Sequence, residues 1–284
     1  MPSGRAITSK VMRVLLTNDD GIAAAGLQAL RRALAEVPDV ELAVIAPAHN
    51  QSATARSITT RRPLAVREVP FADGGIGYAA DGTPVDCVRL ANLGLVDGFI
   101  PELIVSGINH GANLGDDITY SGTVAAALEG IVLGLPGIAV SQQSRAGELD
   151  FRAGEQFSFD VAADFTARLV ADLAGVPLAT GTLLNINVPG GRPHGVEVAR
   201  LGRRVYRDEL VLEHEADDAR AYWIYGPAGR DEQETGTDLA AVAAGRIAVT
   251  PLHFDLTDAA GLDALERYDL ERLLAPAAKE VGER

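Results

Sequence analysis

A short apolar stretch near the start of the chain ends in two adjacent aspartates, and this junction constrains the fold more than any other feature. The stretch is VMRVLLTNDDG, residues 11–21, and its branched aliphatic residues predict a buried parallel strand. Residues 27–35 then predict a helix. In an open α/β sheet, ligands bind just beyond the carboxyl ends of the strands. Asp19 and Asp20 can converge there only where the strand breaks into a turn, which Gly21 permits. Converging carboxylates form a site suited to Mg²⁺ or Mn²⁺.

The same residues also fit a purely local role. In that interpretation Asn18 and Asp19 form an Asx turn, and Asp20 caps the following helix. The stretch by itself leaves both interpretations open, so the choice depends on what the other strand ends carry.

Strand patterns alternate with helical patterns along the first two thirds of the chain. Further buried strands are expected at residues 40–46, 103–106, 137–141 and 183–188, and helices at 85–95, 124–133 and 157–173. Residues 61–78 fit a peripheral hairpin, and Pro84 fits the first position of a helix. We therefore expect an α/β fold with a doubly wound, mostly parallel sheet and helices on both faces.

The regular alternation of strand and helix patterns ends after the last of these strands. Short strands are expected at 196–201, 221–225 and 247–250, separated by long polar segments, and a closing helix at 263–274. Residues 209–220 are charged with few apolar anchors, which is typical of an arm that is mobile or packed on another subunit. We expect a flexible leader at 1–11, a catalytic core at 12–190, and a β-rich extension at 191–284 that packs with the core as one domain and serves oligomerisation.

The charge of the chain limits its partners. The formal net charge is −14, and Lys10 and Lys279 are the only lysines. This balance argues against binding to nucleic-acid polymers, and it excludes phosphate-loop NTPases, which need a Gly-Lys-Ser/Thr motif. A phosphate that approaches such a protein needs local positive charge, for which a bound divalent cation is the obvious source.

The compartment also follows from composition. No apolar run approaches the ~18 residues that a membrane span requires, and the polar start of the chain lacks the apolar core of a signal peptide. We therefore expect a cytoplasmic protein that does not bind membranes. Cys87 is the only cysteine, which excludes an internal disulfide and a thiolate metal cage.

Three expected strand ends carry oxygen ligands. Asp19 and Asp20 follow the first strand, Ser52 follows the second, and Asn109 follows the third. The carboxyl ends of neighbouring parallel strands lie at the same edge of a sheet, so these four side chains can meet. Two carboxylates, a hydroxyl and an amide oxygen leave positions open on an octahedral cation, as a catalytic metal requires. Taken singly, Ser52 and Asn109 are also ordinary loop residues.

A glycine-rich run precedes the helix expected at 124–133. It reads GINHGANLGDDITYSGT, residues 107–123, and its glycines, including Gly111, let backbone N–H groups approach an anion. Ser121, Gly122 and Thr123 place hydroxyl and N–H groups at the positive end of the helix, where a phosphate can bind. The alternative is a helix cap on a flexible loop.

Other polar residues of these loops have less specific patterns. Asp116 and Asp117 are interpreted as a solvated pair. His49 and His110 lie in the proposed active-site loops, where either can contact substrate or protonate a leaving group. Each fits equally well as a surface loop residue.

Several of these motifs together resemble the SurE family of survival-protein nucleotidases. The resemblance spans the chain from about Met12 to Thr257. The turn GIAAAG at 21–26 departs from it, because relatives often carry a polar residue and a proline there. The matching runs are LLTNDDG, APAHNQSATARS, GTPVDC, SGINHGANLGDDITYSGTVAAALEG, LNINVP and GTDLAAVAAGRIAVTPLHFDLT.

The resemblance implies a Rossmann-like core and a C-terminal arm exchanged between the subunits of a homodimer or homotetramer. It implies a metal-dependent phosphatase that acts on nucleoside 5′- and 3′-monophosphates. The family's metal ligands fall on the four oxygen-bearing residues already named. Its phosphate-contacting loop falls on Ser121, Gly122 and Thr123, with Asn18 and Asn113 nearby.

We therefore expect a hydrolase with one divalent cation per subunit, Mg²⁺, Mn²⁺ or Ca²⁺, which withdraws charge from phosphorus and polarises the attacking water. Asp19, with Asn18 beside it, is the catalytic candidate, and whether Asp19 acts as base, nucleophile or ligand alone stays open. Two alternatives are a phosphatase for sugar phosphates or short polyphosphate, and a nucleotide-binding sensor without catalysis.

Overall fold

A computed structural model describes residues 11–146, 156–204, 210–216, 219–224 and 234–274. The leader expected at 1–11 lies outside these residues except for Val11. The chain forms two compact units, Met1–His253 and Phe254–Arg284, which are described separately. In the described residues, no helix has the length and apolar character that a membrane crossing requires.

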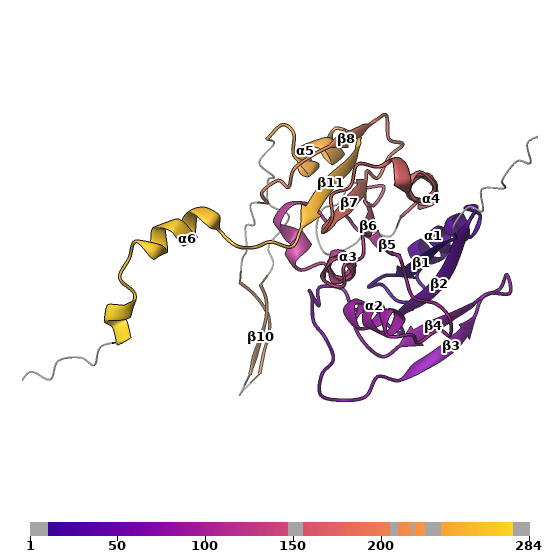
Figure 1. Cartoon of the computed structure of the whole chain (residues 1–284), viewed down its shortest axis with the longest axis horizontal. Coiled ribbons are helices and arrows are strands. Elements are labelled where there is room, and N and C mark those ends of the chain that lie inside the picture. Colours follow the sequence, from indigo (N-terminus) through magenta and orange to yellow (C-terminus); the bar gives the residue numbers. More distant parts are fainter. Residues whose placement is uncertain (1–10, 147–155, 205–209, 217–218, 225–233, 275–284) are drawn as a thin grey trace, which may run out of the picture. The chain divides into compact units, whose positions relative to one another are not determined.

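The first unit is built on a nine-stranded sheet (Figure 1). Its strand order is β3-β4-β2-β1-β5-β6-β7-β11-β8, and the strands from β4 to β7 run parallel. β3 pairs antiparallel with β4, and β11 pairs antiparallel with β7. The expected mostly parallel sheet is confirmed. The strands are β1 (Met12–Thr17), β2 (Val40–Pro47), β3 (Val66–Pro70), β4 (Ile76–Ala80), β5 (Leu103–His110), β6 (Gly137–Gln142), β7 (Thr182–Val188), β8 (Val196–Val198) and β11 (Ile247–His253).

Helices cover both faces of this sheet, as expected. Alternate side chains of β1 serve opposite faces: Val14 and Leu16 pack with α1 (Ala25–Ala35) and α4 (Asp160–Ala171), whereas Leu15 packs with α2 (Pro84–Asn92) and α3 (Gly122–Val132). α2 begins where the sequence predicts, because Thr83 and Asp86 form a capping box and Pro84 occupies the first helical position.

Several boundaries differ from expectation. β5 continues to His110 instead of ending at Ser106, with a register shift against β6 after Ser106. Within the segment predicted as a charged arm, residues 211–215 form β9 (Val211–Glu215), which pairs with β10 (Arg220–Trp223) in a two-stranded hairpin. The short helix α5 (Asp238–Ala243) was not predicted, because its six residues are too few to show a helical period.

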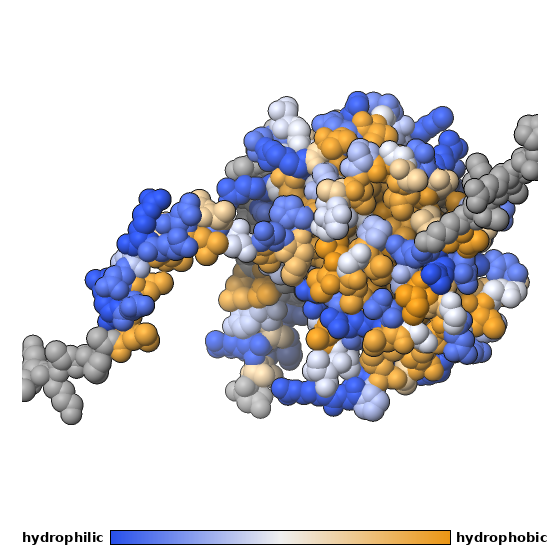
Figure 2. All heavy atoms as spheres, in the orientation of Figure 1, coloured by the Kyte–Doolittle hydropathy of each residue, from blue (hydrophilic) through white to orange (hydrophobic). Residues whose placement is uncertain are grey.

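The second unit contains α6 (Ala259–Glu266) and a 3₁₀ turn (Glu271–Leu274) in place of one helix at 263–274. Two further 3₁₀ turns in the first unit are η1 (Gly115–Thr119) and η2 (Leu173–Gly175). No residue of α6 is buried. Figure 2 shows apolar and polar side chains together on the exposed surface of this segment.

Candidate active site

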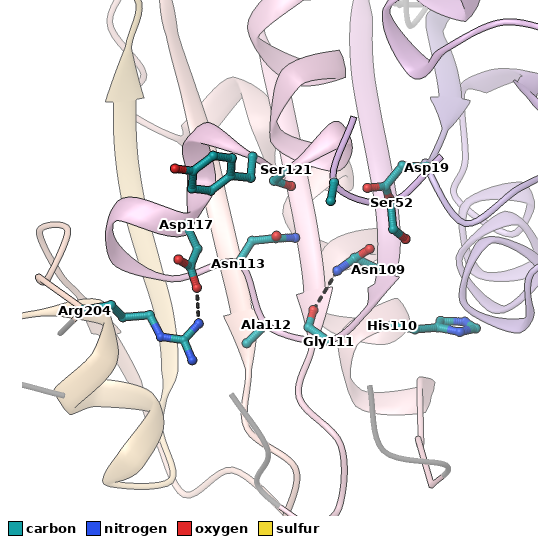
Figure 3. Close-up of a pocket in the computed structure, with 12 residues that line it drawn as sticks. Asp19, Ser52, Asn109, His110, Gly111, Ala112, Asn113, Asp117, Ser121 and Arg204 are labelled. Carbon is teal, nitrogen blue, oxygen red and sulfur yellow. Dashed lines mark hydrogen bonds and ion pairs between the residues drawn. The ribbon is translucent and has the colours of Figure 1, made fainter. Parts of the chain in front are cut away.

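A cavity of about 60 Å³ opens at the carboxyl ends of β1 and β5 (Figure 3). β1 lies between β2 and β5 in the sheet, and the chain leaves β1 towards β2 before it returns to β5 on the other side. Such a switch point is where open α/β sheets bind their ligands. Asp19, Ser52 and Asn109, which follow or end three different strands, all line this cavity.

The turn after β1 is held by Asn18. Its side chain is fully buried, accepts a hydrogen bond from the N–H of Gly21 at 3.2 Å, and donates one to the Gly21 carbonyl at 3.0 Å. Gly21 has φ +105°, a conformation that favours glycine. Asn18 therefore shapes the turn and does not line the cavity. This local bond resembles the turn in the alternative interpretation, whereas a helix cap at Asp20 is not found, since α1 has Ala24 as its N-cap.

Asp19 lies against the start of α3. The hydroxyl of Thr123 donates to Asp19 Oδ1 at 2.5 Å, and the N–H of Thr123 donates to the same carboxylate. Gly122 allows this approach, because a Cβ on Gly122 would lie 2.8 Å from the Cβ of Asp19. In this structure Gly122 thus leaves room for Asp19, and Thr123 donates hydrogen bonds to it. The positive end of the helix favours the negative charge of the Asp19 carboxylate.

The two aspartates form an uncompensated acidic pair. Burial, together with the charge of Asp20, raises the pKa of Asp19 to about 6, and burial raises the pKa of Asp20 to about 6. Asp20 Oδ2 accepts a hydrogen bond from the N–H of His110 at 3.1 Å, and Asp20 itself does not line the cavity. Among the described residues, the ion pairs found involve neither aspartate.

These residues fit a divalent cation. Asp19 is buried and Asp20 is half-buried, and two such carboxylates that form no ion pair with the described residues favour a bound cation. The neutral oxygens of Ser52 and Asn109 add further hard ligands. In the described residues, no group of three or more His, Cys, Asp and Glu side chains could hold a metal. A metal here therefore depends on those two neutral oxygens.

The loop that carries Ser52 is tied to the turn after β1, to the residue before Ser121 at the start of α3, and to α3 itself. The N–H of Gln51 donates to the Asp19 carbonyl at 2.7 Å, and the N–H of Ala55 donates to the Tyr120 carbonyl at 3.1 Å. Arg56 reaches Glu129 on α3 at 2.5 Å. These contacts fix the path of an otherwise exposed loop, so that Ser52 stays beside Asp19.

The segment after β5 shapes the floor of the cavity. Asn109 Nδ2 donates to the Gly111 carbonyl at 2.9 Å, and its amide oxygen points towards Ser52 and Asp19 (Figure 3). Asn113 is anchored from β7: its N–H donates to Asn187 at 2.8 Å, and its carbonyl accepts bonds from Asn185 and Asn187. Asn113 and Ser121 line the cavity between Asp19 and its far end.

The two histidines differ. His49 is exposed and does not line the cavity. His110 lines the cavity, but its Nε2 accepts a hydrogen bond from the N–H of Gly26 at 3.2 Å, and its ring stacks on Phe157 and Phe159. Burial lowers the pKa of His110. In this structure the ring of His110 therefore packs against its neighbours and has its Nε2 occupied by the Gly26 N–H.

Comparison with known proteins identifies the family. Residues 14–208 match the family described as survival protein SurE. A 5′-nucleotidase SurE of Rubrobacter xylanophilus is 53% identical over 267 residues, which cover 93% of this chain and 99% of that protein. One from Chloroflexus aggregans is 47% identical over 264 residues, which cover 92% and 100%. The crystal structure of the SurE protein from Aquifex aeolicus matches with a TM-score of 0.74 and 36% identity, covering 89% of this chain and 99% of that one.

The chain belongs to the SurE family. The resemblance drawn from the sequence motifs is thereby confirmed, together with the α/β fold. A divalent metal requirement is general in this family, whereas the metal and the residues that hold it stay predictions for this SurE chain.

Sequence reasoning missed two groups of residues in and behind this SurE site. Arg204 lines the cavity and pairs with Asp117, which is 3% exposed and therefore is not the solvated residue expected. Asp116, in contrast, is exposed as predicted. Asn185 and Asn187 were also missed, although two asparagines spaced by two in an apolar strand indicate a polar partner on one face.

Proposed function

We propose that this chain is a metal-dependent 5′-nucleotidase that hydrolyses nucleoside monophosphates to nucleoside and phosphate. One observation carries the proposal: Asp19, Ser52 and Asn109 converge on a single small cavity that Asn113 and Ser121 also line. The relatives named 5′-nucleotidase SurE cover nearly the whole chain and support the substrate class. Activity on 3′-monophosphates belongs to the same proposal.

The chain's own residues have distinct roles. Asp19, Asp20, Ser52 and Asn109 would hold the cation, which when bound supplies positive charge to the phosphate and to the attacking water. Thr123 orients Asp19, and Asn18 holds the turn that carries it. We assign catalysis to Asp19.

Side chains along the cavity receive the phosphate. Ser121 and Asn113 line it, whereas Gly111, predicted from the sequence as a phosphate contact, lines it with an N–H that already donates to the Gln142 carbonyl at 2.9 Å. Gly122, Thr123 and Asn18 act indirectly, through Asp19 and its turn. His110 limits the space beside the site, and the structure offers no contact for His49 inside the cavity.

Phosphate release from AMP, with and without Mn²⁺, tests the function. Wild-type protein should release phosphate only with a divalent cation, and Asp19→Asn should lose release while its circular dichroism spectrum stays unchanged. A panel with Mg²⁺, Mn²⁺ and Ca²⁺ identifies the metal. Nucleotide binding without release would favour a sensor, and faster release from sugar phosphates or short polyphosphate would favour the other alternative.

We also propose a division of labour along the chain, with catalysis in residues 12–190 and self-association through residues 191–284. The hairpin β9–β10 has every described residue exposed, including Val211, Leu212 and Tyr222, and an isolated two-stranded hairpin is marginal in water. α6 likewise exposes Leu262 and Leu265. A homodimer or homotetramer in the cytoplasm would cover these side chains. Light scattering of the full chain and of a chain lacking 254–284 measures this.

A further inference from the structure

The candidate active site has a basic residue that the proposed function has not used. Among the described residues that line the cavity, Arg204 carries the only permanent positive charge. Its side chain is 7% exposed. A phosphate ester brings negative charge into this space, and a guanidinium binds phosphate oxygens through paired N–H groups.

Arg204 lies at the end of the cavity that is remote from the proposed metal ligands. In Figure 3, Arg204 and Asp117 are on one side, Asp19 and Ser52 are on the other, and Asn113 lies between them. A phosphoryl group in the middle of the cavity therefore has Asp19 on one side and the guanidinium on the opposite side.

Asp238 fixes the position of this pair. Its carboxylate accepts hydrogen bonds from the N–H groups of Gly115 and Gly202, each at 2.8 Å. The two backbones touch, since a Cβ on Gly115 would lie 2.8 Å from the Gly202 carbonyl oxygen. Asp117 and Arg204 each follow one of these glycines by two residues. Asp238 thus connects the loop before α3 to the segment after β8, and its two hydrogen bonds set the distance between Asp117 and Arg204.

We propose that Arg204 is a substrate-binding residue that donates hydrogen bonds to the phosphate oxygens from the side opposite Asp19. The inference rests on the proposed function and deepens it. Arg204 has five N–H donors in a planar fork, so it can bind Asp117 and an anion together. Asp117 and Asp238 are positioning residues that hold it. The phosphate site is then completed by a residue of the C-terminal extension.

A purely structural ion pair would have different consequences. Removing one partner of a buried pair leaves the other charge uncompensated and destabilises the protein, whereas a neutral pair of similar shape is often tolerated. The double variant Asp117→Asn/Arg204→Gln therefore restores a neutral, hydrogen-bonded pair without restoring the cation. It separates loss of fold from loss of phosphate binding.

The experiment compares wild type, Arg204→Gln, Arg204→Lys and the double variant. Arg31→Gln is the matched control, because Arg31 also has a buried side chain in an ion pair, with Asp73, and does not line the cavity. Unfolding, kcat and KM for AMP, and binding of inorganic phosphate by calorimetry, with and without Mn²⁺, are measured for each.

We expect Arg204→Gln and the double variant to lose about 10²- to 10³-fold in kcat/KM, as when one donor to a transition-state oxyanion is removed. Phosphate should bind at least tenfold more weakly to both, Arg204→Lys should fall between, and Arg31→Gln should match wild type. A folded double variant that binds phosphate within twofold of wild type overturns the proposal. So does a wild-type protein that binds no phosphate. If wild type binds phosphate but releases none from AMP, the proposed function fails while the role of Arg204 in binding phosphate is still measured.

Discussion

Thr123 holds Asp19 by two hydrogen bonds, one from its hydroxyl to Oδ1 at 2.5 Å and one from its backbone N–H. Both side chains are buried, and they are separated by 104 residues in sequence. The carboxylate that follows β1 is therefore aimed by the helix that follows β5. This link between the end of β1 and the start of α3 fixes the carboxylate before any ligand binds.

Replacing Thr123 by valine should weaken metal binding while keeping the shape of the side chain. Residues that orient a metal ligand typically contribute 10- to 100-fold in affinity or activity, so we expect a loss of about that size. Calorimetric titration with Mn²⁺ and phosphate release from AMP measure it. Thr123→Ser keeps the hydroxyl and is the control. A valine variant with wild-type Mn²⁺ affinity would contradict this role.

Gly122 should tolerate no side chain. A Cβ there would lie 2.8 Å from the Cβ and 2.9 Å from Oδ2 of Asp19, so Gly122→Ala must displace the carboxylate. We expect phosphate release to fall at least tenfold with a smaller change in melting temperature. Gly191→Ala is the matched control, because a Cβ at Gly191 meets no atom within 4 Å. Equal activity of the two variants would show that Asp19 moves without cost.

Local patterns were sufficient to predict the central sheet. The apolar runs of β1, β2 and β7 and the place of Pro84 at the start of α2 depend on residues close in sequence, and the structure confirms them. The meeting of the oxygen-bearing residues could also be predicted from the sequence, because the carboxyl ends of parallel strands lie at one edge of the sheet.

The far end of the cavity could not be predicted in this way. Asp117 is buried because Arg204 lies beside it, and that partner is 87 residues away. Gly115 meets Asp238 across 123 residues. Neither contact leaves a period or motif in the sequence, since each depends on how the extension folds back over the loop before α3.

Metal affinity should rise with pH through about pH 6. Burial raises the pKa of Asp19 and of Asp20 from 3.8 to about 6, so between these values the folded metal-free protein holds protons that the unfolded chain has released. Metal-free stability should therefore fall as pH rises through this window. Cation binding must expel the same protons. Mn²⁺ titrations at pH 5.5 and 8 in buffers of different ionisation enthalpy measure affinity and proton release. Proton release that is equal at the two pH values would contradict the raised pKa values.

Arg56 and Arg89 both pair with the buried carboxylate of Glu129, but only Arg56 belongs to the loop that carries Ser52. Arg56→Ala should free this loop from α3 and weaken Mn²⁺ binding several-fold, because Ser52 is then less well held beside Asp19. Arg89→Ala removes a pair of similar length, 2.6 Å against 2.5 Å, and should leave Mn²⁺ binding unchanged. The two variants should lose comparable stability, so a difference in metal affinity reports the loop alone. If both variants bind Mn²⁺ equally, Arg56 does not position Ser52, and the other contacts of the loop, the hydrogen bonds of Gln51 and Ala55, do so instead.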